Sequence, residues 1–178
     1  MKTAVRPEVP VRQVPRGAGT DWSIGMAANP FDLSGKVAFI TGGNGGLGLG
    51  MGIGLAEAGA SIVVASRDEE KTNNAVAQLE ATGAKAMGVS CDVVDAESIA
   101  SAVAQAVEAF GGIDILINNS GTSFRAQPED IPEDEWDRVI DTNLKGPFLV
   151  SKAVYPEIKK RGGGKIINIG SMMSIFAS

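Results

Sequence analysis

The sequence contains 178 residues, of which 44% are hydrophobic, and this length and balance suit one globular domain with a sizeable core. The formal net charge of −5 argues against a nucleic-acid partner, and no apolar run approaches the roughly 20 residues that span a bilayer. The sequence has no histidine and one cysteine, Cys91, which excludes the usual Ser-His-Asp and Cys-His catalytic groups and the common zinc sites. We therefore expect no metal and no membrane partner. Because Cys91 cannot form an internal disulfide, we also expect a cytoplasmic protein.

Residues 1–32 differ in composition from the rest of the chain. Prolines stand at positions 7, 10, 15 and 30, and basic residues outnumber acidic ones in this segment. Prolines at this density break regular elements, and the segment lacks the apolar core of a secretory signal. We expect a disordered N-terminal extension, or an overlong start with translation beginning at Met26. One folded domain should then cover residues 33–178.

From residue 37 onward, short apolar runs alternate with segments of helical periodicity. The apolar runs predict strands at residues 37–41, 61–65, 85–90, 113–118 and 165–169. The periodic segments predict a first helix that follows the glycine cluster and ends at about residue 58, and further helices at about residues 68–81, 96–110, 133–144 and 146–161. Continuous apolar strands are buried on both faces, so the sheet should be parallel with helices on each side. Right-handed crossovers then give a doubly wound α/β fold, for which we expect the strand order 3-2-1-4-5.

A glycine-rich turn lies between the first strand and the first helix, with the sequence TGGNGGLG at residues 41–48. Glycines allow a sharp turn and a close approach of the backbone to a pyrophosphate, and the helix N-terminus adds free N–H groups. A Walker-type phosphate loop is excluded because no Gly-Lys-Ser/Thr follows the turn. The turn therefore predicts a dinucleotide site.

Five motifs in chain order resemble those of the short-chain dehydrogenase/reductase family. They are Thr-Gly-x-x-x-Gly-x-Gly at 41–48, Asp92-Val93, Asn-Asn-Ser-Gly at 118–121, Asn143 and Ser171. At position 120 the chain has Ser where the family pattern has Ala. The resemblance implies a Rossmann fold and a nicotinamide dinucleotide. By position it implies these cofactor-binding residues: Thr41, Gly42, Asn44, Gly46, Leu47, Gly48, Ser66, Arg67, Asp92, Val93, Asn118, Ser120 and Gly121.

The resemblance also implies the chemistry, which is hydride transfer between the nicotinamide and a carbonyl or secondary alcohol. In this family a tyrosine moves the proton, a lysine four residues later lowers the tyrosine pKa, a serine polarises the substrate oxygen and an asparagine holds a water. Ser171 and Asn143 take the last two roles. The family's tyrosine follows its serine by more residues than remain after Ser171, so we expect a C-terminally truncated and inactive chain. Tyr155 and Lys159 have the Tyr-x-x-x-Lys spacing but precede Ser171, and we interpret Tyr155 as a surface residue.

The end of the second strand should decide between NAD and NADP. A carboxylate there bonds the ribose 2′-hydroxyl of NAD, whereas a cation accommodates the 2′-phosphate of NADP. The position reads Ser66-Arg67 followed by Asp68, and the guanidinium favours NADP. The alternative is that Arg67 is solvated and that Asp68 reaches the ribose of NAD.

The sequence indicates the substrate less clearly than it indicates the cofactor. Ser-Met-Met-Ser at 171–174 resembles gluconate 5-dehydrogenase and 2-deoxygluconate 3-dehydrogenase, which suggests a sugar acid, and a 3-oxoacyl-carrier-protein reductase is an alternative. A non-catalytic dinucleotide-binding fragment is a further alternative. Members of the family associate through the helix at residues 146–161. We therefore expect a homo-oligomer, a tetramer or dimer in the full-length protein, and an apolar patch on that helix.

Overall fold

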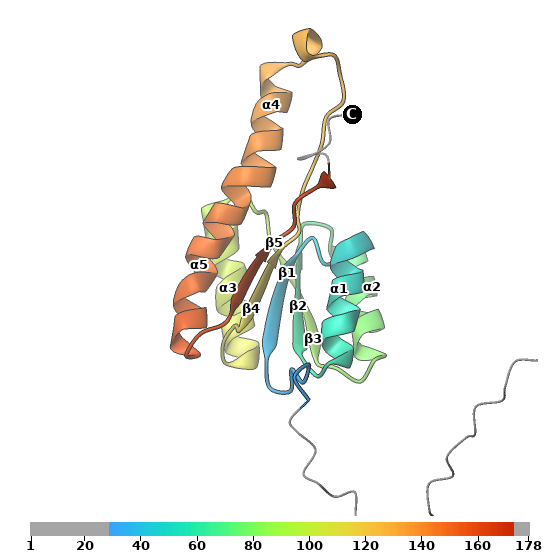
Figure 1. Ribbon diagram of the computed structural model, residues 1–178, viewed down its shortest axis with the longest axis vertical. Helices are drawn as coiled ribbons and strands as arrows, with labels where there is room; N and C mark the ends of the chain where they lie inside the picture. Colours follow the sequence, from blue (N-terminus) through green and yellow to red (C-terminus); the bar gives the residue numbers. More distant parts are fainter. Residues whose placement is uncertain (1–28, 173–178) are drawn as a thin grey trace, which may run out of the picture. The chain divides into compact units, whose positions relative to one another are not determined.

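The computed structural model describes residues 29–172, and one compact unit begins at Phe31 (Figure 1). Residues 1–28 and 173–178, which include most of the expected N-terminal extension, lie outside the described residues. No helix in the described part of the chain is long and apolar enough to cross a membrane.

Five parallel strands form one sheet in the order β3-β2-β1-β4-β5, which confirms the predicted topology. The strands are β1 Val37–Thr41, β2 Ser61–Ser66, β3 Ala86–Ser90, β4 Ile115–Asn118 and β5 Lys165–Asn168. In register, Thr41 at the end of β1 pairs with Ala65 of β2 and with Asn118 of β4. The carboxyl ends of the strands therefore meet at one edge of the sheet, where the predicted motifs follow them.

Helices cover both faces of this sheet. In Figure 1, α1 (Gly46–Glu57) and α2 (Glu69–Glu80) lie on one face, and α3 (Ala96–Phe110) and α5 (Gly146–Lys160) lie on the other. Successive strand residues point to opposite faces. Phe39 accordingly packs in the core under α3 and α5, while its neighbour Ile40 packs in the core under α1 and α2. This double burial explains why the central strands read as continuous apolar runs.

One long helix replaces the two separate helices expected at residues 133–144 and 146–161. Helix α4 (Glu133–Ile140) continues through a π-helical segment, η2 (Asp141–Lys145), directly into α5. Pro147 has no N–H group, and its ring crowds the carbonyl group four residues earlier. The wider π-turn, in which the Gly146 N–H donates to the Asp141 carbonyl, accommodates this proline without breaking the helix. A short 3₁₀ turn, η1 (Pro128–Asp130), precedes α4.

The expected burial of the apolar strands is wrong for β5. Strands β1 and β4 are buried throughout, but all four residues of β5 are exposed among the described residues, with Ile167 at 44%. Strand β5 lies at the sheet edge and pairs only with β4. The apolar residues of β5 therefore remain exposed to solvent on this edge strand.

Apolar side chains are also exposed along the long helix. On α5 they include Phe148 at 64% and Tyr155 at 58% exposed, which is the apolar surface expected on residues 146–161. The surface continues onto α4 and η2 through Trp136, Ile140 and Leu144. Trp136, Ile140, Leu144 and Phe148 recur every fourth residue, so these four share one side of the helix.

A buried carboxylate joins β1, β4 and the end of α5 at the opposite edge of the sheet. The side chain of Asp114 is 3% exposed and accepts hydrogen bonds from Arg161 Nη2 at 3.0 Å, Lys36 Nζ at 3.3 Å and the Val37 N–H at 3.0 Å. Burial by itself raises the pKa of Asp114, but the hydrogen bonds from Arg161, Val37 and Lys36 outweigh it, so the pKa is lowered.

Replacing Asp114 with Asn should lower the free energy of unfolding by about 2 kcal/mol near neutral pH, because Arg161 and Lys36 lose an ionised buried partner. Folding lowers the pKa of Asp114. The stabilisation is therefore complete above the unfolded pKa of about 3.9 and is lost as the pH falls through the lower folded value.

Urea unfolding of the parent chain and Asp114→Asn at several pH values measures this effect, and the difference between the two proteins should shrink on acidification. Asp130→Asn, which removes an exposed carboxylate, is the control and should change stability by less than about 0.5 kcal/mol. A difference between parent and Asp114→Asn that stays constant with pH would contradict a role for the ionised carboxylate.

Candidate functional site

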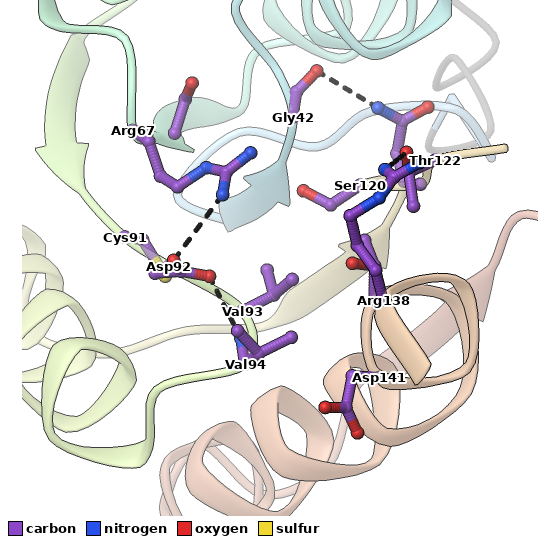
Figure 2. Close-up of a pocket in the computed structure, with 14 residues that line it drawn as sticks. Gly42, Arg67, Cys91, Asp92, Val93, Val94, Ser120, Thr122, Arg138 and Asp141 are labelled. Carbon is purple, nitrogen blue, oxygen red and sulfur yellow. Dashed lines mark hydrogen bonds and ion pairs between the residues drawn. The ribbon is translucent and has the colours of Figure 1, made fainter. Parts of the chain in front are cut away.

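The loops that follow β1, β2, β3 and β4 meet at a cavity of about 520 Å³ (Figure 2). Helix α4 and segment η2 close another side of it. The lining residues are Gly42, Ser66, Arg67, Cys91, Asp92, Val93, Val94, Asn119, Ser120, Gly121, Thr122, Arg138, Asp141 and Thr142. The cavity lies at the carboxyl edge of the sheet, where parallel α/β folds bind ligands.

Two glycines let the turn after β1 pack tightly. Gly42 has a φ of +63°, which favours glycine, and a Cβ on it would lie 3.0 Å from Asn119 Nδ2. A Cβ on Gly48 would lie 2.3 Å from the Gly42 carbonyl oxygen, a distance that no side chain tolerates. The first turn of α1 therefore lies directly against the backbone of Gly42, and both positions require glycine.

The N-terminus of α1 differs from those of α2 and α3. Helix α2 is capped by Asp68 and α3 by Asp95, and each has acidic residues in its first turn. Helix α1 has no side-chain cap and no acidic residue in its first turn. Its first N–H groups and its positive dipole end are thus available to an anion beside the glycine turn.

Polar side chains from three loops form the edge of the cavity beyond β2 and β3. Asn44 Nδ2 donates to Ser66 Oγ at 2.6 Å, which joins the glycine turn to the end of β2. Arg67 pairs with Asp92 on the neighbouring loop, with 3.6 Å between Nη1 and Oδ2 (Figure 2). Asp92 Oδ1 also accepts a hydrogen bond from the Val94 N–H at 3.2 Å. This edge can therefore offer both a cation and a carboxylate to a ligand.

Cys91 lines the same cavity, and its surroundings favour the protonated thiol. The residue is buried, and this burial, together with the charges of Asp92 and Asp95, raises the pKa of Cys91 to about 11. The thiol stays protonated at neutral pH, whereas a nucleophile or metal ligand requires the thiolate. No group of three or more potential metal-binding side chains occurs within residues 29–172.

The loop after β4 is fastened to the long helix at two points. The side-chain amide of Asn143 accepts from the Thr122 N–H and donates to the Thr122 carbonyl, both at 2.8 Å. Arg138 contacts the Thr122 hydroxyl and donates to the Ser123 carbonyl at 3.4 Å. Asn143 thus uses its side chain to hold the cavity wall, and its side chain does not line the cavity itself.

The first asparagine of the Asn-Asn-Ser-Gly motif is buried under the loop. Asn118 Nδ2 lies 2.8 Å from Asn168 Oδ1 and 3.0 Å from Ser151 Oγ, so it links β4 with β5 and α5. Its Oδ1 has no hydrogen-bond partner among the described residues. Asn118 therefore holds the ends of the strands together beneath the site.

The cavity contains seven of the thirteen residues expected to bind a cofactor: Gly42, Ser66, Arg67, Asp92, Val93, Ser120 and Gly121. The others do not line it, and they lie in the supporting turn, in α1 or beneath the loop: Thr41, Asn44, Gly46, Leu47, Gly48 and Asn118. Ser171 follows β5 at the same edge of the sheet but does not line the cavity. Tyr155 is exposed on α5, as its interpretation as a surface residue requires.

Sequence reasoning missed seven lining residues. Asn119 lies inside the recognised motif at 118–121, and Cys91, Val94 and Thr122 directly adjoin recognised motifs, so a wider window would have included these three. Arg138, Asp141 and Thr142 come from the long helix, and no local pattern indicates that this helix passes the carboxyl ends of β3 and β4.

Comparison with known proteins agrees with this fold. Residues 36–178 match the family described as short chain dehydrogenase. Dehydrogenase/reductase SDR family member 4 of Bos taurus is 43% identical over 152 residues, which are 84% of this chain and 54% of that protein. The 2,5-dichloro-2,5-cyclohexadiene-1,4-diol dehydrogenase LinX of Sphingobium indicum is 41% identical over 144 residues, 81% of this chain and 58% of that protein.

Solved structures show the same similarity. NAD⁺-bound xylitol dehydrogenase superposes with a TM-score of 0.79 at 34% identity, covering 82% of this chain and 56% of that one. A short-chain type dehydrogenase/reductase from Mycobacterium marinum gives a TM-score of 0.80 at 35% identity, covering 83% and 60%. The chain belongs to the short-chain dehydrogenase family. It spans little more than half the length of these relatives.

Replacing Gly48 with Ala should destabilise the chain by at least about 2 kcal/mol, because the new Cβ would collide with the Gly42 carbonyl oxygen. Gly50 is the matched control in the same helix, since a Cβ there meets no atom within 4 Å. Gly50→Ala should raise the free energy of unfolding by up to about 1 kcal/mol. Urea unfolding measures both effects. Equal changes in the two variants would contradict the close approach of α1 to Gly42.

Proposed function

We propose that this chain is the dinucleotide-binding part of an NAD(P)-dependent oxidoreductase that transfers hydride between a nicotinamide and a carbonyl or secondary alcohol. The observation that carries the proposal is the glycine turn packed under an uncapped α1 N-terminus beside a cavity of about 520 Å³. The nicotinamide ring, when bound, supplies or accepts the hydride. The chain's own residues bind and orient it.

The residues of the cavity fit such a cofactor. The N–H groups at the start of α1 would hold the pyrophosphate, because no side chain of the described residues caps this helix. Asp92 and Val93 would contact the adenine, and Ser66 and Arg67 would contact its ribose. Ser120 and Gly121 line the wall between these groups and the long helix.

Arg67 supports NADP as the preferred cofactor, with NAD as the alternative. The competing carboxylate, Asp68, already caps α2: its Oδ1 accepts from the Lys71 N–H at 3.0 Å, and its Oδ2 lies 3.0 Å from Lys71 Nζ. The backbone hydrogen bond from Lys71 is the main reason why the pKa of Asp68 is lowered. A carboxylate engaged in this way is less available to a ribose hydroxyl, whereas Arg67 is exposed at the cavity.

The substrate class follows from the relatives and from the expected catalytic residues. Ser171 would polarise the substrate oxygen, and Asn143, whose side chain is bonded to Thr122, would hold a water of the proton relay. Xylitol dehydrogenase and the cyclohexadiene-diol dehydrogenase are named for hydroxylated substrates, which supports a secondary alcohol or its ketone. A sugar acid is our preferred substrate, and a 3-oxoacyl-carrier-protein reductase activity is the alternative. We place the protein in the cytoplasm as a homo-oligomer.

A non-catalytic dinucleotide binder is the second candidate function. The sequence contains one tyrosine, Tyr155, and its side chain is exposed on α5 and does not line the cavity. The 178 residues therefore place no tyrosine–lysine pair at the cavity, and this polypeptide should bind a dinucleotide without turning it over.

Replacing Arg67 with Ala should weaken NADPH binding by about 1.5–3 kcal/mol, roughly tenfold to 150-fold, the scale of a hydrogen bond to a charged group. NADH binding should change little because NADH has no 2′-phosphate. Fluorescence titration of the two nucleotides measures both dissociation constants. Arg125→Ala, which removes an exposed cation outside the cavity lining, is the control. Equal losses for NADPH and NADH would show that Arg67 does not recognise the phosphate.

The purified 178-residue chain should show no turnover of NADPH with ketones or keto sugar acids. Positioned acid–base catalysis contributes about 10²–10⁴-fold, and Ser171 and Asn143 supply no tuned acid. The parent chain and Tyr155→Phe are assayed side by side, with nucleotide binding as the control for folding. Turnover that disappears in Tyr155→Phe would place the active site at Tyr155. Turnover unaffected by that substitution would reveal a different acid, and either result would contradict the prediction.

A further inference from the structure

Arg67 is not a free cation, because it is paired with Asp92 at the same edge of the cavity (Figure 2). We propose that Asp92 is a second determinant of cofactor preference, and that it acts through Arg67 by competing with the 2′-phosphate for the guanidinium. This inference rests on the proposed dinucleotide-binding function and adds to it a residue that weakens the selection of NADP over NAD.

Asp92 is the fixed partner of this pair. Its N–H donates to Ser98 Oγ at 2.9 Å, and its Oδ1 accepts from the Val94 N–H at 3.2 Å. Its side chain is 35% exposed, against 76% for that of Arg67. The carboxylate is thus held by the loop after β3, and the long arginine side chain is the part that can change partners.

The charges at this edge of the cavity explain why the exchange matters. With Arg67 on Asp92, the pair presents no net charge to the ribose position. To bind Arg67, the 2′-phosphate of NADP must displace the Asp92 carboxylate, which remains close by. The 2′-hydroxyl of NAD can bind without breaking the pair of Arg67 and Asp92. The neighbouring carboxylates Asp68 and Asp95 cap α2 and α3, so Asp92 is the carboxylate that is paired with Arg67 in the described chain.

The size of the effect follows from the exposure of the two groups. Pairs between largely exposed charges contribute up to about 1 kcal/mol, which corresponds to roughly a fivefold change in an equilibrium constant. We define the preference for NADPH as the dissociation constant of NADH divided by that of NADPH. Removing the Asp92 charge should therefore raise this preference by about twofold to fivefold. Loss of an adenine contact by Asp92 would affect both nucleotides and cancel in this ratio.

A direct repulsion between Asp92 and the phosphate would also raise this ratio, so one variant is not sufficient. The experiment compares the parent chain, Asp92→Asn, Arg67→Gln and the double variant by fluorescence titration with NADPH and NADH at one ionic strength. Asparagine retains an oxygen that can accept from the Val94 N–H, and Asp92→Ser provides a second variant with the same property. Glu70→Gln, on the exposed first turn of α2, is the control for net charge.

We expect Asp92→Asn and Asp92→Ser to raise the preference for NADPH when Arg67 is present and to change it less than about twofold when Arg67 is Gln. Glu70→Gln should leave the preference unchanged. Equal increases in both backgrounds would show direct repulsion and overturn the inference, as would an unchanged preference in the parent background. Failure of the parent chain to bind either nucleotide would contradict the proposed function itself, and with it this inference, and so differs from a failure of the coupling alone.

Discussion

The hydroxyl group of Thr41 joins the carboxyl ends of β1 and β4, and the site depends on this junction. Thr41 Oγ1 is buried and accepts the N–H groups of Asn119 at 3.0 Å and Ser120 at 3.1 Å. In return, Asn119 Nδ2 donates to the carbonyl groups of Thr41 and Gly42. These bonds hold the glycine turn against the loop after β4, so the two segments enter the cavity wall side by side.

The same junction explains the tight glycine packing. Asn119 lies where a Cβ on Gly42 would point, and Gly48 of α1 lies against the Gly42 carbonyl oxygen. The helix N-terminus is consequently brought to the cavity with its N–H groups uncapped. In a chain with a net charge of −5, these N–H groups are a local source of positive potential, which is why an anionic ligand suits this edge.

Predictions from the sequence were correct where a local pattern is compatible with only one kind of structure. Continuous apolar runs separated by segments of helical periodicity predicted the parallel sheet and its strand order. They failed where the outcome depends on distant parts of the chain. Pro147 was expected to begin a new helix, but the π-turn at Asp141–Lys145 carries the helix past it. Strand β5 is apolar yet exposed, because burial depends on what packs against a strand and not on its composition.

The sequence alone determined the order of the strands and helices and the positions of the glycines in the turn. It also predicted that the motifs Asp92-Val93 and Asn118–Gly121 lie at the same edge of the sheet. These follow from local sterics and from burial on both faces, which act over a few residues. Only the tertiary structure decided that Arg67 pairs with Asp92, that Asn143 holds Thr122 and that Arg138 closes the cavity wall. Such contacts join residues far apart in the chain, and they depend on crossover geometry that no local spacing encodes.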